Sequence, residues 1–305
     1  MQKLQIGTSN ITASEIGLGC MRISTLSKEE AARVIQNAVE AGVDFFDHAD
    51  IYGKGKAEET FAEAIKLTSI QREDILLQTK CGIRKGYFDF SKEHIIESVD
   101  GSLQRLQTDY IDILLLHRPD ALMDPEEVAE AFRILEKSGK VRQFGVSNQN
   151  SMQIELLNQY IEQKLIVNQL QFSLMHTGML DAGLNVNMQN SAGIVRDSSV
   201  IDYCRLHNMT VQAWSPFQYG MIKGPFVGNE QFPEVNAKLQ ELAEHYNITA
   251  AAVAIAWILR HPAKIQPIVG SMNLERLLDI VKASEIQLTR KEWYELYRAA
   301  GNELP

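Results

Sequence analysis

The sequence predicts an α/β fold in which eight parallel strands close into a (β/α)8 barrel, the TIM barrel. Short apolar runs rich in Ile, Val, Leu and Phe alternate with amphipathic stretches about eight times, as when crossover helices join parallel strands. The chain has 305 residues, 45% hydrophobic and 23% charged, which excludes disorder as its main state. One large core fits this length, so we expect residues 1–305 to form a single barrel domain.

The elements follow from the position of each apolar run and each amphipathic stretch. The expected strands are residues 15–19, 44–48, 75–80, 111–117, 142–147, 166–170, 210–214 and 266–270. Helices are expected to begin near residues 27, 57, 91, 125, 150, 197, 234 and 273. A short N-terminal β-hairpin is expected between Leu4 and Ile16, and an extra C-terminal helix from Thr289 to Gly301.

Capping residues support several of these boundaries. Ser27 and Ser91 stand where a hydroxyl oxygen accepts a hydrogen bond from the free amides at a helix start. Gly42 and Gly139 suit the left-handed conformation that ends a helix.

Two connections, residues 173–197 and 216–233, are longer than the usual 2 to 6 residues. The first is either a lid over a binding site or a surface excursion.

Charge, hydropathy and cysteine content exclude several classes of function. Lys and Arg number 30 against 39 Asp and Glu, and a net charge of −9 argues against binding to nucleic acid. The longest apolar run, Ala250–Leu259, is half the length of a membrane span, and the first residues lack the apolar region of a signal peptide. We therefore expect a cytoplasmic protein. Cys20, Cys81 and Cys204 show no C-x-x-C spacing, so neither disulfides nor a zinc site is expected.

Polar or reactive residues stand where the expected strands end. Because the carboxyl ends of barrel strands share one rim, where active sites of such barrels lie, these side chains are expected to converge. They are Asp47, Lys80, His117, Ser147, Asn148, Gln169, Trp214, Ser215, Gly270 and Ser271.

These strand ends belong to longer motifs. They are Asp47-His48-Ala49-Asp50-Ile51-Tyr52-Gly53, Gln78-Thr79-Lys80-Cys81, Leu114-Leu115-Leu116-His117-Arg118-Pro119, Phe144-Gly145-Val146-Ser147-Asn148, Val167-Asn168-Gln169, Ala213-Trp214-Ser215-Pro216 and Ile268-Val269-Gly270-Ser271. In this order and spacing, over essentially its whole length, the chain resembles the aldo-keto reductases. The resemblance implies an NADPH-dependent oxidoreductase that reduces an aldehyde or ketone to an alcohol by hydride transfer.

The family's catalytic tetrad falls on Asp47, Tyr52, Lys80 and His117, with Tyr52 as the proton donor. A free tyrosine titrates near 10, and one opposite charge shifts a pKa by about 1 to 3 units, so Lys80 is expected to bring the pKa of Tyr52 to roughly 7 to 9. Asp47 would hold Lys80 charged, and His117 would orient the carbonyl oxygen through one ring N–H. Taken without the motifs, the same residues also fit an ordinary buried ion pair, a loop aromatic and a strand-end histidine.

Two residues near Asp47 complicate the assignment. His48 replaces the small hydroxyl residue of many family members, which puts the local substrate contact in doubt. Asp50 is the other candidate for the acid, and Asp47 is preferred on its spacing to Tyr52.

The resemblance also implies where the cofactor lies. Trp214 would stack on the nicotinamide, Ser147, Asn148 and Gln169 would bind its carboxamide, and Arg276 suits a 2′-phosphate. NADP is favoured over NAD, although the basic residue often found near Gly270 is missing and Asp279-Ile280 departs from the usual adenine-binding pair. The implied cofactor-binding residues are Gly19, Cys20, Met21, Asp47, Ser147, Asn148, Gln169, Trp214, Ser215, Phe217, Gln218, Gly270, Ser271 and Arg276.

Other functions are less favoured by the motifs. No G-x-G-x-x-G, nucleophile elbow or H-E-x-x-H is present, which argues against a Rossmann fold, serine hydrolysis and a metal site. Two alternatives stay open: a cofactor-binding regulatory or sensor barrel with little turnover, and a lyase that uses Lys80 as a Schiff-base nucleophile. The expected partner is a small carbonyl compound, and the chain is expected to be a monomer.

Overall fold

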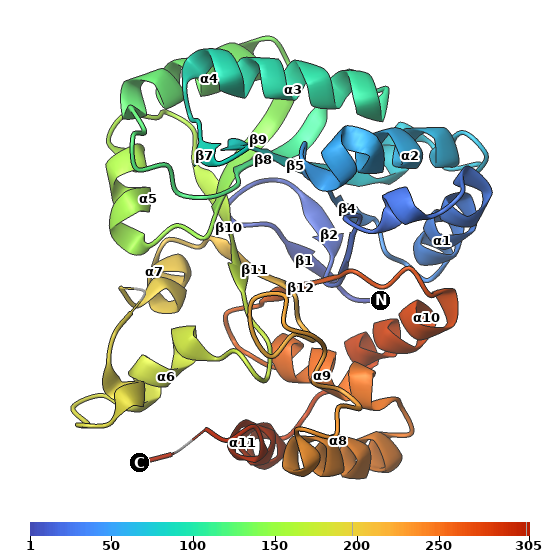
Figure 1. Ribbon diagram of the computed structural model, residues 1–305, viewed down its shortest axis with the longest axis vertical. Helices are drawn as coiled ribbons and strands as arrows, with labels where there is room; N and C mark the ends of the chain where they lie inside the picture. The colour runs from blue at the N-terminus through green and yellow to red at the C-terminus, as the bar shows by residue number, and fades with distance from the viewer. Residues whose placement is uncertain (197, 303) are drawn as a thin grey trace.

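Eight parallel strands form a closed barrel at the centre of the computed structural model, which describes residues 1–196, 198–302 and 304–305 (Figure 1). The ring runs β10-β11-β12-β3-β4-β5-β8-β9 and closes where β9 pairs with β10. The strands are β3 (Gly17–Gly19), β4 (Phe45–Asp47), β5 (Leu76–Cys81), β8 (Ile111–Leu116), β9 (Val141–Ser147), β10 (Leu165–Gln171), β11 (Thr210–Trp214) and β12 (Gln266–Val269). The predicted fold class is confirmed, and every predicted barrel strand overlaps an observed one.

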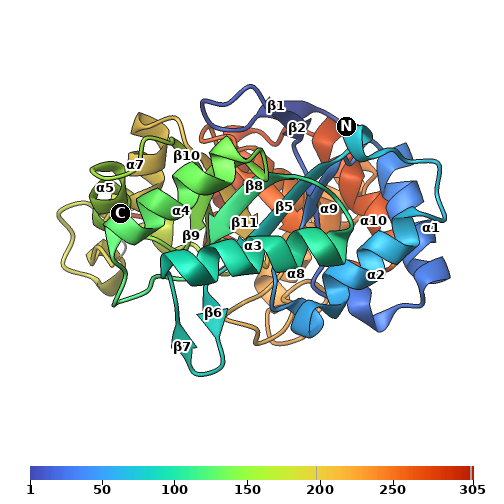
Figure 2. The same ribbon diagram turned by 90° about the horizontal axis from the view of Figure 1, so that it is seen from above.

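Helices surround this barrel and bury their apolar faces against it (Figures 1 and 2). They are α1 (Lys28–Glu40), α2 (Lys56–Ile65), α3 (Lys92–Leu106), α4 (Pro125–Lys137), α5 (Ser151–Asn158), α7 (Val200–Leu206), α8 (Pro233–Tyr246), α9 (Ala250–Leu259) and α10 (Leu274–Val281). The predicted caps are present, since Ser27 accepts from the Glu30 amide and Ser91 from the His94 amide.

The stretch after residue 234 differs from the prediction, because it contains two helices instead of one. Asn247 adopts a left-handed conformation with φ of 55° and ends α8, and Thr249 then caps α9 by accepting from the Ala252 amide. The two helices meet at an angle of 90°. Within the described part of the chain, no single helix has the length and apolarity of a membrane span, and only this bent pair passes such a test.

A β-hairpin, β1 (Lys3–Gln5) and β2 (Thr12–Ser14), lies across the amino-terminal end of the barrel, as predicted. Ile6 and Ala13 pack with Phe45, Ile113 and Val167 in a small core cluster inside that end. This apolar plug leaves the carboxyl end of the strands as the place for polar chemistry.

Three further segments lie outside the barrel strands. The C-terminal helix α11 (Arg290–Ala299) is present as predicted. The long connection after β10 contains α6 (Gly178–Leu184) and a 3-10 turn. The helix start predicted near 197 falls on Asp197, which lies outside the described residues, and α7 begins at Val200. A second hairpin, β6 (Ile83–Arg84) with β7 (Tyr87–Phe88), was not predicted and projects on the face opposite the first hairpin (Figure 2).

Asp112, near the start of β8, links three neighbouring segments at the amino-terminal end of the barrel. Its carboxylate, 1% exposed, accepts from Arg72 Nη2 at 2.7 Å, from the Leu77 amide at 2.9 Å and from Arg142 Nη1 at 3.1 Å. Removing this carboxylate leaves the buried Leu77 amide and the partly buried Arg72 guanidinium without an acceptor, and an unsatisfied buried donor costs about 1–3 kcal/mol.

We expect Asp112→Ala to lower the free energy of unfolding by about 2–3 kcal/mol, measured by urea denaturation. Asp100→Ala is the matched control, because Asp100 pairs with Lys140 at 2.6 Å but both side chains are exposed. That exposed pair contributes less than about 1 kcal/mol. Equal losses in the two variants would contradict this account.

Candidate active site

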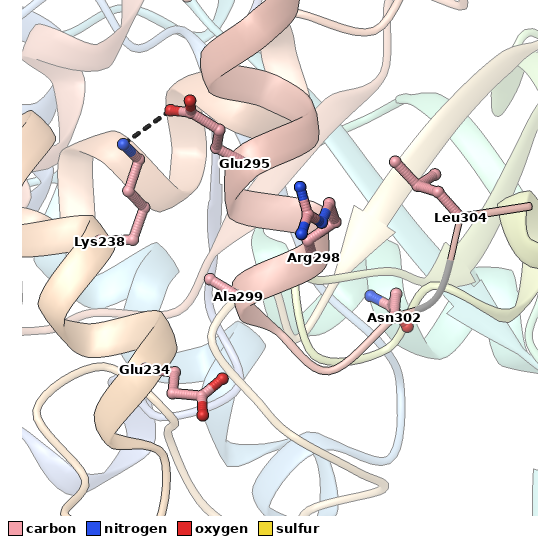
Figure 3. Close-up of a pocket in the computed structure, with 7 residues that line it drawn as sticks. All are labelled: Glu234, Lys238, Glu295, Arg298, Ala299, Asn302 and Leu304. Atoms are coloured by element: carbon pink, nitrogen blue, oxygen red, sulfur yellow. Dashed lines mark ion pairs between the residues drawn. The ribbon is translucent and has the colours of Figure 1, made fainter.

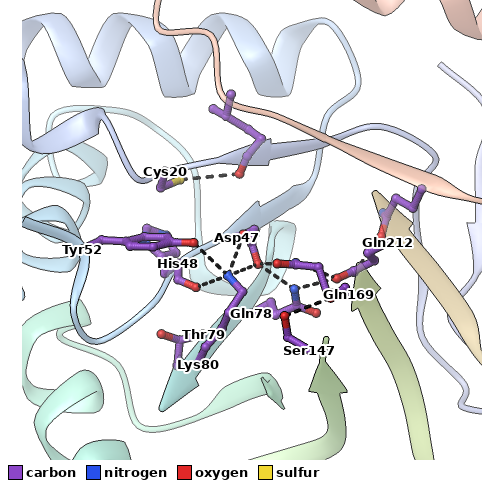
Figure 4. A network of polar contacts seen from close by, with 12 residues as sticks. Cys20, Asp47, His48, Tyr52, Gln78, Thr79, Lys80, Ser147, Gln169 and Gln212 are labelled. Carbon is purple, nitrogen blue, oxygen red and sulfur yellow. Dashed lines mark hydrogen bonds and ion pairs between the residues drawn. The ribbon is translucent and has the colours of Figure 1, made fainter. Parts of the chain in front are cut away.

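Four predicted side chains meet at the carboxyl end of three adjacent strands. Asp47 ends β4, Lys80 lies near the end of β5, and His117 directly follows β8. Tyr52 begins the 3-10 turn after β4 and reaches back over the barrel (Figure 4). The parallel pairing of β4 with β5 and of β5 with β8 brings these three strand ends together.

Lys80 is the centre of the group. Its Nζ donates to both carboxylate oxygens of Asp47 at 2.8 Å, to the backbone oxygen of His48 at 2.6 Å and to the hydroxyl of Tyr52 at 3.4 Å. The side chains of Lys80 and Asp47 are 0% and 4% exposed. Burial opposes the charge, but Asp47 and Tyr52 outweigh it and raise the pKa of Lys80. The ammonium is therefore charged at neutral pH.

Tyr52 differs from the expectation in its acidity. Burial raises the pKa of Tyr52 above its ordinary value of 10, because loss of water disfavours the phenolate more than Lys80 favours it. The expected pKa of roughly 7 to 9 for Tyr52 is therefore wrong for this structure. The hydroxyl keeps its proton at neutral pH.

His117 lies beside Tyr52, with ring centroids 6.0 Å apart in an edge arrangement. Burial, with the charges of Lys80 and Arg118, holds the pKa of His117 well below its usual range. The ring is therefore neutral at pH 7 and carries one N–H. Its Nδ1 is buried with no hydrogen-bond partner among the described residues.

The acid that pairs with Lys80 is Asp47, not Asp50. One oxygen of Asp50 is buried without a partner among the described residues, and burial together with Glu58 raises the pKa of Asp50 to about 7. The ring of His48 packs edge-on against Phe61 with centroids 4.7 Å apart, and burial lowers its pKa to about 3. Only the backbone oxygen of His48 contacts Lys80.

A set of glutamines inside the barrel supports Asp47, and sequence reasoning assigned no role to most of it. Gln78 Nε2 donates to Asp47 Oδ1 at 2.6 Å and to Gln212 Oε1 at 2.8 Å. Gln169 Nε2 donates to the same two oxygens, each at 3.0 Å (Figure 4). Gln212 continues the chain to Gln266 at 2.9 Å. The available signal was a glutamine within the apolar strands β5, β10, β11 and β12.

These hydrogen bonds limit how the side chain of Gln169 could bind the carboxamide of a nicotinamide. Both hydrogen bonds that its amide nitrogen makes stay inside the protein, so only its oxygen is left to face a ligand.

Trp214 lies at the end of β11 with its indole held in place. Its Nε1 donates to Asn148 Oδ1 at 3.1 Å, and Asn148 donates to the hydroxyl of Ser147 at 2.7 Å. The guanidinium of Arg118 lies 5.4 Å from the indole centroid. Asn148 and Ser215 both have positive φ, 57° and 53°. A half-buried indole with a fixed edge offers a flat surface at the rim.

The other predicted cofactor-binding residues line the same rim in three groups. Gly19 and Cys20 are buried at the end of β3, while Met21 is 47% exposed. Phe217 and Gln218 begin a folded segment in which Gln218 accepts from the Gly224 amide at 2.8 Å. Gly270, Ser271 and Arg276 surround the start of α10.

The residues around α10 fit the phosphate end of a dinucleotide. A Cβ built on Gly270 would meet nothing within 4 Å, so the backbone there is open to close approach. Arg276 is exposed in the first turn of α10, and it forms no ion pair among the described residues. Helix amides and a free guanidinium are groups that bind phosphate.

A family model and two relatives match this chain over nearly its whole length. A model of the Aldo/keto reductase family matches residues 15–300. The chain is 36% identical, over the whole of both chains, to the uncharacterized oxidoreductase YcsN of Bacillus subtilis. It is 33% identical, also over both whole chains, to a 6-dehydroglucose reductase of Agrobacterium fabrum.

Solved structures share the fold. A thermostable aldo-keto reductase, Tm1743, has a TM-score of 0.79 at 24% identity and covers 98% of this chain and 100% of its own. An aldo-keto reductase of Bombyx mori in complex with NADP has a TM-score of 0.74 at 22% identity, covering 98% and 92% of the two chains.

The buried pair generates a prediction about stability. Lys80→Met leaves the Asp47 carboxylate buried without its counter-ion, so we expect the free energy of unfolding to fall by about 3–5 kcal/mol. Asp47→Asn combined with Lys80→Met removes both charges and should recover part of that loss. Urea denaturation of both single variants and the double variant measures the coupling; additive losses would contradict a direct interaction.

Proposed function

This chain belongs to the aldo/keto reductase family, and from that membership we propose that it reduces an aldehyde or ketone with NADPH and that Tyr52 donates the proton. The observation that carries the proposal is the contact between Tyr52 and the buried Lys80–Asp47 pair, with Nζ 3.4 Å from the hydroxyl. A phenol in contact with a fixed ammonium is suited to release its proton to a neighbouring oxygen.

The reduction requires a hydride at the carbonyl carbon and a proton at the carbonyl oxygen. A bound nicotinamide dinucleotide supplies the hydride. Tyr52 supplies the proton, which it retains at neutral pH because burial raises its pKa. The O–H bond of Tyr52 breaks as the alcohol O–H forms, and Lys80 stabilises the phenolate that is left.

Neutral His117 has the role of a hydrogen-bond donor. Because its pKa lies well below 6.5, its one N–H can point at the carbonyl oxygen without competing as an acid. The rings of Tyr52 and His117 lie side by side, with centroids 6.0 Å apart and planes at 81°. Both side chains can therefore donate to the same carbonyl oxygen.

Trp214 and the α10 region are proposed to hold the cofactor. The indole of Trp214, fixed by Asn148, is the stacking surface for the nicotinamide, and Ser147 with the oxygen of Gln169 binds its carboxamide. Ser271, the first amides of α10 and Arg276 bind the adenosine phosphates. A free guanidinium favours NADP over NAD at this position.

The substrate is proposed to be a small carbonyl compound. Two relatives are named 6-dehydroglucose reductase and are 33% and 32% identical to this chain over nearly its whole length. A sugar with an aldehyde at its end is therefore one compound to test. Monitoring NADPH oxidation against aldehydes, ketones, dicarbonyls and 6-dehydroglucose tests the activity. A protein that quenches its tryptophan fluorescence with NADPH but reduces none of these would instead be a regulatory or sensor barrel.

We expect Tyr52→Phe to lower kcat by at least about a hundredfold, since the proton donor is lost while the ring remains. NADPH affinity, measured by fluorescence quenching, should stay within about twofold because Tyr52 is not proposed to hold the cofactor. Cys81→Ser is the matched control: its thiol is buried next to Lys80 but has no part in the mechanism. Full activity in Tyr52→Phe would defeat the assignment.

Arg276→Gln tests the choice of cofactor. We expect KM for NADPH to rise about tenfold and KM for NADH to change little, because only NADPH carries the 2′-phosphate. Lys282→Gln at the other end of α10, where Lys282 pairs with Asp279 at 2.7 Å, should leave both values unchanged. An equal rise for both cofactors would place Arg276 elsewhere on the dinucleotide.

A further inference from the structure

We compare two cavities that described residues form away from the proposed active site; they differ in charge. The larger, about 690 Å³, lies between α8 and α11 (Figure 3). Its lysine, Lys238, already pairs with Glu295 at 2.7 Å and Glu241 at 2.8 Å. The described lining carries two acids, Glu234 and Glu295, and two bases, Lys238 and Arg298, so its formal charges cancel and favour no charged ligand.

The second cavity, about 360 Å³, combines arginines with apolar walls, and we propose that it binds a small aromatic carboxylate. The arginines would hold the carboxylate and the apolar walls the ring. The lining comes from α6, α7, the turn after α9 and the first two turns of α11. None of these segments contributes a residue to the tetrad. Figure 1 shows α6, α7 and α11 to one side of the barrel strands.

Among the described residues, three guanidinium groups and one carboxylate line this cavity, an excess of positive charge. Arg205 is 3.4 Å from Asp202, the one acid that the described part of the lining contains. Arg260 and Arg290 form no ion pair within 4.0 Å among the described residues. Unpaired arginines in a cavity are suited to a planar carboxylate, which they bind through two parallel hydrogen bonds.

The side chain of Arg260 is held ready for such a ligand. Its Nε donates to the backbone oxygen of Leu288 at 2.6 Å, which orients the guanidinium without neutralising it. Arg290 begins α11 immediately after the cap residue Thr289, so its side chain is not needed for capping. A cation fixed by a backbone carbonyl loses less entropy on binding than a free surface arginine.

His261 adds a neutral hydrogen-bond donor to the lining of the cavity. Its Nδ1 accepts from the Ala263 amide at 3.2 Å, so the ring hydrogen is on Nε2. Burial, together with the positive charge of Arg205, lowers the pKa of His261 to about 4. The ring is therefore neutral at pH 7, and its Nε2–H is available as a hydrogen-bond donor.

The apolar part of the lining is rigid and aromatic. Trp293 stacks on Trp257 with centroids 4.8 Å apart and on Tyr297 at 5.8 Å, with both pairs within 9° of parallel. Tyr297 donates to Asp181 at 2.7 Å and so links α11 to α6, two of the helices that line the cavity. Leu180 and Ile201 complete an apolar wall. This volume is at the lower end for ligand sites, which suits an acid of one or two rings.

Isothermal titration with 2-naphthoate tests the proposal, with the neutral 2-naphthalenemethanol as the comparison ligand. We expect wild type to bind the acid at least tenfold more tightly than the alcohol. Arg290→Gln and Arg260→Met should each weaken binding of the acid at least tenfold, the scale of a charge-assisted hydrogen bond. Arg33→Gln, an exposed arginine of α1, is the matched control and should bind like wild type.

The Trp214→Ala variant distinguishes binding of 2-naphthoate in the arginine cavity from binding at the mouth of the barrel. Retained affinity in Trp214→Ala supports the arginine cavity, and loss of affinity there overturns it. Equal affinity for the acid and the alcohol, or unchanged affinity in Arg290→Gln, also overturns it. Thermal melts verify that each variant is folded; Arg290 is exposed, so its variant remains decisive if Arg260→Met does not fold. No readout depends on reductase activity, so the two proposals fail independently.

Discussion

The ion pair between Lys80 and Asp47 is the interaction on which the candidate site depends. Two nearly inaccessible charges are stable inside a protein only when their hydrogen-bonding capacity is used. Here the carboxylate accepts from Lys80, Gln78 and Gln169, and the ammonium also donates to the His48 backbone oxygen. The pair is thereby fixed, and the remaining contact of Lys80 is directed at Tyr52.

The two ends of the barrel differ in their side chains: one end is closed by apolar residues and the other carries the polar residues of the candidate site. At the amino-terminal end, the β1–β2 hairpin and the cluster around Ile6 close the barrel with apolar side chains, and Asp112 links adjacent strands. At the carboxyl end, polar side chains replace the apolar ones. The glutamines connect the two regions. Gln266 donates to the Ser14 backbone oxygen of the hairpin, and the chain of hydrogen bonds continues through Gln212 and Gln78 to Asp47.

Two opposing effects decide the acidity of Tyr52. The ammonium of Lys80 favours the phenolate, but its charge is shared with Asp47 and its Nζ is 3.4 Å away. Burial of the hydroxyl acts in the other direction and is the larger effect, so the pKa rises. A phenol that stays protonated suits the proton-donor role proposed for Tyr52, because the proton must be present when the substrate arrives.

The eight strands, the helix caps and the residues at the strand ends could be predicted from the sequence, because they depend on local periodicity and short motifs. The break between α8 and α9 also had a local signal at Asn247 and Thr249. The preference for Asp47 over Asp50 also came from local spacing, and the contact of Asp47 with Lys80 agrees with it. The support of Asp47 by glutamines from four strands, and the cavity shared by arginines from three segments, were visible only in the folded chain. Strand register, burial and the electrostatic field at a site depend on residues that are far apart in the chain. A local sequence pattern therefore cannot predict them.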